Sequence, residues 1–456
     1  MMKQKKQYTS IGILLLIWIS ALLTPRFTKG VIDDNMLPLS EGDTLTTSFV
    51  PVSWPATTIP VTDSLCRITD DTHSIESFFV ALDSLRAGKD TVISVVHLGD
   101  SHIQAGHYSG QTMRLLQQQF GNTGRGWISP LKLSKTNEPD DYFISSVVKE
   151  WIAGRCIQKV KKTSLGIGGI GIQTESPSVN FDISIAPNNG AGYSFNQAVL
   201  YRGDKSMPML PAGKSKESAH VSFDKGIHIP GILADTFHIS FLTDTLQLHS
   251  TRRKQGTDTL LPASSFNSVY YGFNLTNGKP GILYHSIGVN GAMFVNYTDE
   301  NYVRQLALLN PSLLIISLGT NETFGRNFTS QEFEGQAKDF IRLVKKYMPD
   351  VCILLTTPPE CYKRVRVNKK RTFVRNDNTQ RAAKALVDVA RKEGIACWDL
   401  FSATGGKKSS RKWQEKQMFG RDRIHFTKEG YQEQGTLLFR ALMDTYNQTR
   451  ENKSEN

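Results

Sequence analysis

A serine and a distant aspartate–histidine pair are the residues of this chain whose types and spacing are best suited to chemistry. Ser101 ends the tripeptide Gly-Asp-Ser, which directly follows an apolar, β-branched run at 92–98. Such a run predicts a buried strand, and the tripeptide predicts a tight turn that exposes the hydroxyl at the strand's carboxyl end. Asp422 and His425 lie three residues apart near the other end of the chain. Because a serine without a base is a weak nucleophile, the two segments together predict acyl transfer.

Each of these residues has a defined part in the attack on an ester carbonyl. His425 would take the proton of Ser101, and Asp422 would hold the imidazole in one tautomer and stabilise the imidazolium. The carbonyl oxygen becomes an oxyanion, which needs preorganised hydrogen-bond donors. We expect these donors to be the side-chain amide of Asn321 and the backbone N–H groups of Gly291 and Ser101.

An alternation of strands and helices would bring these residues together. Strands are predicted at 92–98, 281–287, 313–318, 351–357 and 395–400, and helices near 75–85, 113–120, 300–309, 331–347, 378–393 and 428–443. This alternation predicts an α/β fold, a doubly wound and mainly parallel sheet with helices on both faces. The candidate segments each follow a strand or precede a helix, and so should meet at the carboxyl edge of the sheet: 99–101, 288–292, 319–322 and 422–425.

Each segment taken singly also has a structural explanation. A Gly-Asp-Ser after a strand is commonly a plain turn, Asp422 could cap the following helix, and Asn321 could be a helix N-cap. The occurrence of all the segments in this order favours the catalytic interpretation. His102 could contact substrate or hold the turn, and we favour the structural role. Asn290 is a further candidate contact with substrate.

Between the first predicted strand and the remaining ones, the alternation of strand and helix patterns is interrupted. From about 130 to 280 it consists of short alternating apolar runs, such as 179–185 and 237–242, separated by turn residues and without a long helical pattern. Many short strands with such turns predict a β-sandwich. The sandwich would then be an insertion within the α/β domain.

The N-terminus predicts export. Lys3, Lys5 and Lys6 precede an apolar run at 11–23, and Arg26 follows it. This run is shorter than the roughly 20 residues of a membrane span and resembles a secretory signal. No small-x-small cleavage motif is evident after the run, so an uncleaved anchor in the inner membrane remains an alternative to a cleaved signal.

These patterns divide the chain into six parts. We expect a signal peptide or anchor at 1–30, a Thr/Pro-rich extended linker at 31–73, the first part of the catalytic domain at 74–129, the inserted sandwich at 130–280, the second part of the catalytic domain at 281–445, and a frayed polar tail at 446–456. The five cysteines match no metal-site spacing, and a disulfide framework is not expected. Cys352 and Cys397 should act as small buried apolar residues.

The net charge of +12 suits polyanionic surroundings. The excess is concentrated in two segments, whose cations are Lys363, Arg364, Arg366, Lys369, Lys370, Arg371 and Arg375 in one, and Lys407, Lys408, Arg411, Lys412 and Lys416 in the other. They could be solvated loops or a docking surface, and the two alternatives are evenly balanced. Because no nucleic-acid recognition motif accompanies the charge, nucleic acid is not expected as a partner.

The four segments resemble the blocks of the SGNH (GDSL-like) hydrolases, whose named residues match Ser101, Gly291, Asn321 and His425. The resemblance covers residues 92–128 and 281–443. The third block here has Glu322 where that family usually has an aspartate, which should not affect the amide of Asn321. The first block reads Gly-Asp-Ser-His in place of Gly-Asp-Ser-Leu.

The second departure narrows the resemblance to the peptidoglycan O-acetylesterases of the bacterial envelope. The stretches 98–102, 284–292 and 398–401 are similar to that group, which also has a β-sandwich like a carbohydrate-binding module inserted between its first two blocks. The resemblance implies a periplasmic enzyme that removes O-acetyl groups from a polysaccharide, with peptidoglycan favoured, through an acetyl-serine and without metal or cofactor.

Three alternatives stay open at this point. The same triad could transfer acetyl to a glycan hydroxyl, the substrate could be another polysaccharide such as acetylated xylan, or the protein could be a glycan-binding protein without activity. The intact set of blocks argues against the last. The oligomeric state does not follow from the sequence.

Overall fold

The structure, a computed structural model, describes residues 49–186, 192–224, 229–251 and 267–454. The predicted signal or anchor at 1–30 lies outside these residues, so export stays a prediction. Within the described part, no helix is both long enough and apolar enough to cross a membrane.

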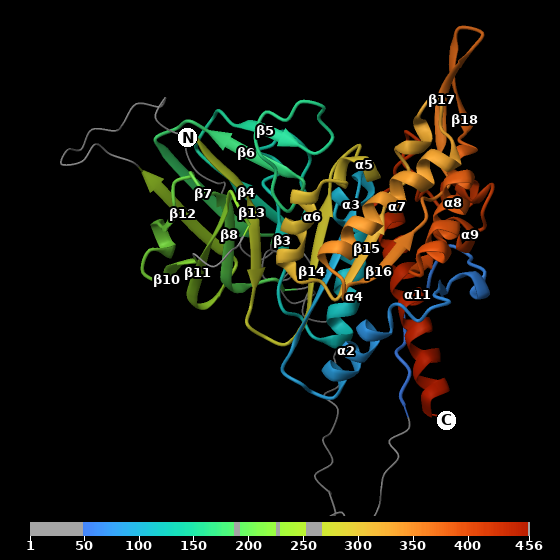
Figure 1. Cartoon of the computed structure of the whole chain (residues 1–456), viewed down its shortest axis with the longest axis horizontal. Coiled ribbons are helices and arrows are strands. Elements are labelled where there is room, and N and C mark those ends of the chain that lie inside the picture. The colour runs from blue at the N-terminus through green and yellow to red at the C-terminus, as the bar shows by residue number, and fades with distance from the viewer. Residues whose placement is uncertain (1–48, 187–191, 225–228, 252–266, 455–456) are drawn as a thin grey trace, which may run out of the picture. The chain divides into compact units, whose positions relative to one another are not determined.

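A six-stranded sheet forms the centre of the α/β domain (Figure 1). Its strands, in spatial order, are β14 (Gly281–Gly288), β2 (Val92–Gly99), β15 (Leu313–Ser317), β16 (Cys352–Thr356), β19 (Ala396–Trp398) and β1 (Ile68–Thr69). All neighbouring pairs are parallel except β1 with β19. The predicted, mainly parallel sheet is therefore confirmed, and β2 lies between the strands that lead to the second and third candidate loops.

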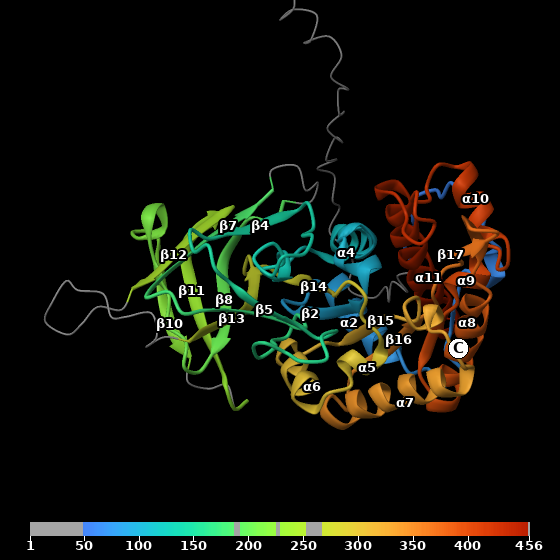
Figure 2. The same ribbon diagram turned by 90° about the horizontal axis from the view of Figure 1, so that it is seen from above.

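Helices cover both faces of this sheet (Figure 2). Successive side chains of a strand point to opposite faces, so the apolar strands need a cover on each side. Val95 shares an apolar core with α2 (Glu76–Arg86), α4 (His107–Phe120) and α11 (Lys428–Ser454). Val96 shares a second core with α6 (Glu300–Leu306), α7 (Ser330–Tyr347) and α8 (Asn378–Glu393). The shorter helices are α3 (Ser101–Gln104), α5 (Phe294–Tyr297), α9 (Leu400–Ala403), α10 (Ser409–Glu415), η1 (Asp63–Leu65), η4 (Ala307–Leu309) and η5 (Glu322–Phe324). The arrangement confirms the doubly wound α/β fold.

Between β2 and β14 the chain forms two antiparallel sheets. The larger has the order β10, β11, β8, β13, β6, β5, with β3 paired to β13, and the smaller has the order β4, β7, β12, β9. Phe181 of the smaller sheet packs against Tyr270 and Phe273 of the larger, with ring centroids 5.0 and 5.8 Å apart. The two sheets thus bury a common core, which confirms the predicted β-sandwich insertion.

The elements of this insertion begin slightly earlier than residue 130. They are β3 (Gly126–Ile128), β4 (Tyr142–Ser145), β5 (Ile152–Arg155), β6 (Ile170–Thr174), β7 (Ser178–Ile185), β8 (Phe195–Gly203), β9 (Leu210–Pro211), η2 (Gly213–Ser215), β10 (Ala219–Asp224), β11 (Ile232–Thr243), β12 (Thr245–Thr251) and β13 (Ser268–Thr276). Since β3 pairs with β13, the first and last strands of the insertion lie side by side. The insertion therefore leaves and rejoins the α/β domain at neighbouring points.

The prediction of an extended linker up to residue 73 is wrong for the part from residue 49 onward. The backbone N–H of Val52 donates to Asn447 Oδ1 at 2.8 Å, and that of Ile59 donates to Glu433 Oε1 at 2.6 Å. Further on, β1 adds to the edge of the central sheet. The Thr- and Pro-rich composition suggested a tether, but apolar residues within it, such as Ile59, are buried against the domain.

The prediction of a frayed tail after residue 445 is also wrong, because α11 continues to Ser454. Tyr446 is fully buried, and Arg450 is 8% exposed. Arg450 Nη1 donates to Glu76 Oε1 at 2.7 Å, and its Nε lies 2.7 Å from Asp83 Oδ2. Polar composition suggested fraying, whereas these side chains pair with carboxylates of α2.

The first basic segment forms an antiparallel hairpin of β17 (Tyr362–Val367) and β18 (Lys370–Arg375). Its turn residues Asn368 and Lys369 have φ of 48° and 63°, which is typical of a tight two-residue hairpin turn. The sequence did not predict these strands, because cations occupy three of the six positions of each. In Figure 1 the hairpin projects from the α/β domain.

All five cysteines are buried and carry free thiols. Cys352 in β16 and Cys397 in β19 are each 2% exposed and pack among apolar residues of the two cores. Their predicted role as small buried apolar residues is confirmed.

We expect Asn447→Ala to lower the free energy of unfolding by about 2 kcal/mol, since it removes the partners of the buried N–H and C=O groups of Val52. Urea unfolding measures this change. As a control on the same helix, Lys453→Ala removes an exposed ion pair with Glu76 and should cost about 0.5 kcal/mol or less. A loss for Asn447→Ala no larger than that of the control would show that this side chain does not hold the N-terminal segment.

Candidate active site

Ser101 is the first residue of α3 and follows the end of β2 after one residue, Asp100. Asp100 caps this short helix, since its Oδ1 accepts a hydrogen bond from the backbone N–H of His102 at 2.9 Å. The preceding Gly99 has no side chain because a Cβ there would collide with Ile103 and lie 2.8 Å from the carbonyl oxygen of Ser317. The turn is therefore packed closely against β15 and presents Ser101 at the carboxyl edge of the sheet, as expected.

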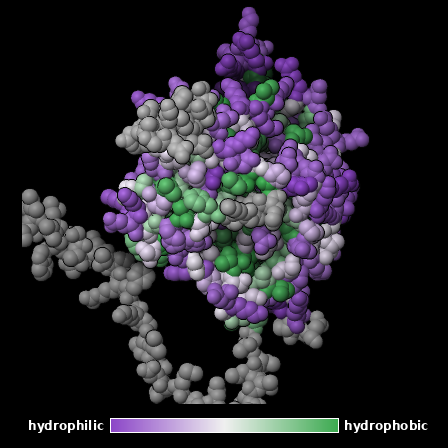
Figure 3. Space-filling model, turned by 60° about the vertical axis from the view of Figure 1, so that its left-hand side comes forward, coloured by the Kyte–Doolittle hydropathy of each residue, from purple (hydrophilic) through white to green (hydrophobic). Residues whose placement is uncertain are grey.

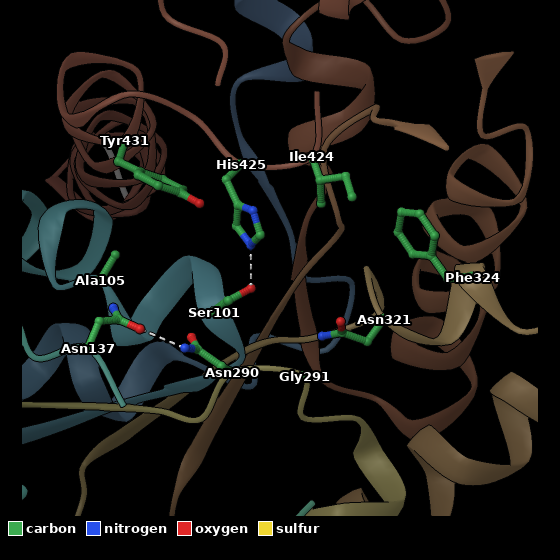
Figure 4. A pocket seen from close by; sticks show the side chains of 10 residues that line it. All are labelled: Ser101, Ala105, Asn137, Asn290, Gly291, Asn321, Phe324, Ile424, His425 and Tyr431. Carbon is green, nitrogen blue, oxygen red and sulfur yellow. Dashed lines mark hydrogen bonds between the residues drawn. The ribbon is translucent and has the colours of Figure 1, made fainter. Parts of the chain in front are cut away.

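Ser101, His425 and Asp422 form a continuous line of hydrogen bonds, of which Figure 4 shows the one between Ser101 and His425. Ser101 Oγ lies 2.8 Å from His425 Nε2, and His425 Nδ1 lies 2.6 Å from Asp422 Oδ2. The serine and the histidine are separated by 324 positions in the chain. This geometry is that of a nucleophile, a base and a group that orients the base.

Asp422 is held by its own turn. Its Oδ1 accepts hydrogen bonds from the backbone N–H groups of Ile424 and His425, each at 3.0 Å. Burial raises the pKa of the carboxyl, but the hydrogen bonds from the side chain and backbone of His425 and from Ile424 outweigh burial and lower the pKa below its ordinary value of 3.8. Asp422 is thus ionised at neutral pH and can keep the proton of His425 on Nδ1, so that Nε2 is available as a base.

The loops after β14 and β15 reach the same pocket as Ser101. Gly291 adopts a φ of +82°, a left-handed conformation that favours glycine, and lies beside Asn321 in the pocket wall. Gly288, at the end of β14, approaches α3 closely, since a Cβ there would lie 2.7 Å from the carbonyl oxygen of Asp100. All three predicted sources of oxyanion donors are therefore together, as the parallel sheet led us to expect.

The amide of Asn321 is firmly positioned. Its Nδ2 donates to Asp100 Oδ2 and to the carbonyl oxygen of Ala292, both at 3.0 Å. An oxyanion at this place would have to share one of these hydrogens in a three-centre bond. Asp100 is 1% exposed, and burial raises its pKa to about 7. Its position shows that Asp100 both organises the turn and orients the amide of Asn321.

The pocket has a volume of about 570 Å³. Figure 4 shows its ten lining residues, which are Ser101, Ala105, Asn137, Asn290, Gly291, Asn321, Phe324, Ile424, His425 and Tyr431. The sequence did not point to five of these as site residues: Ala105, Asn137, Phe324, Ile424 and Tyr431. Ile424 lies within the segment 422–425, and the other four lie outside the recognised segments. Only the apolar character of Phe324, Ile424 and Tyr431 could have suggested a pocket wall.

His102 does not line this pocket. It is 5% exposed, its Nδ1 lies 2.9 Å from the hydroxyl of Tyr431, and its ring packs 5.3 Å from that of His425. Burial lowers the pKa of His102 to about 3, so it stays neutral beside His425. The burial of His102 favours the structural role over a contact with substrate.

Asn290 lies in the pocket wall and joins it to the insertion. Its Nδ2 donates to Asn137 Oδ1 at 2.6 Å and to Thr136 Oγ1 at 3.2 Å, and its backbone N–H donates to Gln104 Oε1. Asn137 and Thr136 belong to the loop between β3 and β4. The insertion therefore supplies part of the pocket.

Glu322 lies behind the pocket, directly after Asn321. Its Oε1 accepts a hydrogen bond from the backbone N–H of Phe294 at 2.9 Å, while its Oε2 is buried without a hydrogen-bond partner among the described residues. Burial raises the pKa of this carboxyl to about 7. The glutamate thus ties the loop after β15 to α5 and leaves the amide of Asn321 in the pocket.

Comparisons with known proteins agree with this geometry. Residues 263–433 match the GDSL-like lipase/acylhydrolase family, a range that contains Gly291, Asn321, Asp422 and His425 but not Ser101, which lies before the insertion. The structure is similar to that of a peptidoglycan O-acetylesterase, with a TM-score of 0.65 and 20% identity, over 84% of this chain and 99% of that chain. This likeness shows that the two chains share a fold.

A second similar structure is a GDSL-like lipase from Bacteroides thetaiotaomicron. It is 18% identical, with a TM-score of 0.27, over 35% of this chain and 76% of that chain. Among curated protein sequences, none matches this chain significantly.

The raised pKa of Glu322 predicts a pH-dependent stability. The folded state favours the protonated acid of Glu322. The contribution of this group to the free energy of unfolding is therefore fully present below its ordinary pKa of 4.5 and is lost as pH rises toward about 7. In Glu322→Gln this fall should be smaller by on the order of 2 kcal/mol, because glutamine keeps the acceptor for Phe294 and does not ionise.

Unfolding by urea at pH 4.5 and pH 8 measures the difference. Asp100 also has a pKa raised to about 7, so both carboxyls contribute to the pH dependence of the wild type's stability. The contribution of Glu322 is therefore the difference between the pH dependence of the wild type and that of Glu322→Gln. Parallel pH profiles for the wild type and Glu322→Gln would contradict the prediction.

Proposed function

Because this chain is a carboxylic ester hydrolase of the SGNH (GDSL-like) superfamily, we propose that it is an exported serine esterase that removes O-acetyl groups from a polysaccharide, with peptidoglycan as the favoured substrate. The observation that carries the proposal is the line of hydrogen bonds from Asp422 through His425 to Ser101 at the wall of an open pocket. The place of action would be the bacterial cell envelope.

In the acylation step, Ser101 Oγ attacks the acetyl carbonyl while its proton passes to His425 Nε2. The imidazolium that forms is stabilised by the ionised Asp422 at 2.6 Å. Negative charge develops on the carbonyl oxygen, which would face the backbone N–H groups of Ser101 and Gly291 and the amide of Asn321. Collapse of this intermediate breaks the ester bond, and the sugar oxygen leaves with the proton from His425.

In the deacylation step, water attacks the acetyl-serine and His425 again takes a proton. The side chains of His425 and Asp422 are 40% and 48% exposed, so that water reaches the site freely. This exposure favours hydrolysis over transfer of the acetyl group to a second sugar, for which water would have to be excluded.

The pocket can also accommodate a glycan ester. Its volume of about 570 Å³ is within the roughly 300–1,000 Å³ of small-molecule sites, which leaves room for a sugar unit beside the acetyl group. The loop of the insertion that carries Asn137 forms part of the wall, so that a polymer could contact both parts of the chain. The structurally similar peptidoglycan O-acetylesterase supports peptidoglycan as the first substrate to test.

We expect Ser101→Ala to lower the rate of acetate release from O-acetylated peptidoglycan at least about 10³-fold, because the nucleophile is lost. Acetate is measured on O-acetylated peptidoglycan and on acetylated xylan, with the wild type beside the variant. Faster release by the wild type from peptidoglycan supports the proposed substrate, and faster release from xylan overturns it. Unchanged release in Ser101→Ala would rule out the acetyl-serine mechanism.

We expect Asn321→Ala to lower kcat about 10²-fold with little change in KM, because an oxyanion donor acts mainly in the transition state. Asn290→Ala is the matched control, since it truncates an asparagine in the same pocket whose amide is bonded to Asn137 and Thr136. It should change kcat much less. Equal losses of kcat in the two variants would contradict the assignment of Asn321 as an oxyanion donor.

A further inference from the structure

The hairpin of β17 and β18 is a concentrated source of positive charge. It contains seven cations and no carboxylate, and Arg364, Arg366, Lys369, Lys370 and Arg371 are exposed. Within the described part of the chain, carboxylates pair with Arg375 at the base of the hairpin but with none of its other six cations. Charges that served only to keep an exposed hairpin soluble could be of either sign. The uniform sign therefore indicates a polyanionic partner.

The arginines and the lysines of the hairpin are sorted between its two faces. Residues directly opposite in an antiparallel pair share a face, and the pairs Arg364 with Phe373, Arg366 with Arg371, and Tyr362 with Arg375 therefore lie on one face. We call the four arginines of these pairs the arginine face. Lys363 and Lys370 belong to pairs on the opposite face. Like charges directly opposite each other repel, as Arg366 and Arg371 do here, and a bound anion would relieve this repulsion.

The arginine face is turned toward the catalytic loop. Arg423, between Asp422 and His425, lies with its guanidinium carbon 5.4 Å from the ring centre of Tyr362 and 4.7 Å from that of Phe373. The backbone N–H of Tyr362 also donates to the carbonyl oxygen of Arg423 at 2.8 Å. The hairpin is thereby fixed to the loop that carries the proposed base.

The other end of the hairpin is fixed to the opposite wall of the pocket. After β18, the buried Asn376 donates from Nδ2 to Thr323 Oγ1 at 2.9 Å, in the loop that follows Asn321. The hairpin thus rises between the His425 loop and the Asn321 loop. A polymer on the arginine face would continue toward the pocket, and Figure 3 shows the hairpin as a strongly hydrophilic projection at the top of the molecule.

The second basic segment is joined to the base of the hairpin through Glu360. This carboxylate is 2% exposed, accepts hydrogen bonds from the backbone N–H groups of Lys408 and Ser410, and lies 3.5 Å from Arg375 Nε. The N-terminal end of α10, with its lysines, therefore adjoins the hairpin. The two basic segments of the sequence thus meet at the base of the hairpin.

We propose that the arginine face binds the carboxylates of an acidic glycan and guides the ester-bearing strand into the pocket. The proposal rests on the proposed polysaccharide esterase function and names the class of its substrate, a carboxylate-bearing polymer. Arginine suits this ligand, because its guanidinium forms two parallel hydrogen bonds with one carboxylate. Carboxylates spaced along a strand would meet successive arginines of the hairpin.

Binding of polygalacturonate tests the surface, since this acidic glycan carries no acetyl ester and its binding does not depend on catalysis. Arg366→Gln combined with Arg371→Gln should weaken binding about tenfold at low salt. Lys363→Gln combined with Lys370→Gln is the matched control, because it removes the same charge from the opposite face of the same hairpin, and it should weaken binding about twofold or less. Equal losses in the two double variants would overturn the proposal.

Three further probes identify the chemistry of the ligand. Dextran, which is neutral, should not bind measurably, and binding as tight as that of polygalacturonate would overturn the proposal. Tighter binding of polyphosphate would assign the surface to phosphates and overturn the carboxylate assignment. Tighter binding of phosphatidylglycerol vesicles would assign it to a membrane surface, with the same consequence.

Activity separates this proposal from the proposed function. On acetylated polygalacturonate the arginine double variant should raise KM about tenfold with kcat unchanged, and on p-nitrophenyl acetate it should match the wild type. If the wild type released no acetate from any glycan but the two double variants still bound differently, the proposed function would fail and the surface would stand. If glycan acetate were released and the two double variants bound equally, only the surface would fail.

Discussion

The site depends on how closely the turn after β2 packs against the two strands beside it. Gly99 and Gly288 end neighbouring parallel strands, and a side chain on either would collide with α3 or its surroundings. Because both positions lack a side chain, Ser101 lies within hydrogen-bonding distance of His425, and Asp100 reaches Asn321. Both contacts follow from this packing at the carboxyl edge of a parallel sheet. A second constraint, the buried carboxylate of Asp100, links the nucleophile's turn to the predicted oxyanion donor.

Much of the fold could be predicted because its strands and helices have strong apolar patterns. The run before Ser101 is buried at seven of its eight positions, and α7 and α8 bury one apolar stripe each. The parallel arrangement followed from the alternation of these elements, and with it the meeting of Ser101, Gly291, Asn321 and His425. The residues of the site were predictable because four motifs had to end at one edge.

The remaining parts depend on contacts that leave no local pattern. The segment from Phe49 to Thr69 is irregular in composition, and its position is set by single side chains of α11 such as Asn447 and Glu433. The last turns of α11 are polar in sequence, but they are ordered because Arg450 pairs with carboxylates of α2. Tyr431 and Asn137 enter the pocket from elements whose motifs say nothing about it. Pairings between distant elements decided all of these cases.

The position of the insertion has a consequence for how the chain is made. The central strand β2 is synthesised before the whole β-sandwich, whereas its two neighbours β14 and β15 follow it. Until then β2 has unpaired edges, the state in which an apolar strand is most exposed to aggregation. The pairing of β3 with β13 counteracts this, because a folded sandwich holds the two chain ends that flank it side by side. The pairing of β2 with β14 then costs little loop-closure entropy. A folded sandwich would therefore help the catalytic sheet to fold, independently of any ligand that the sandwich binds.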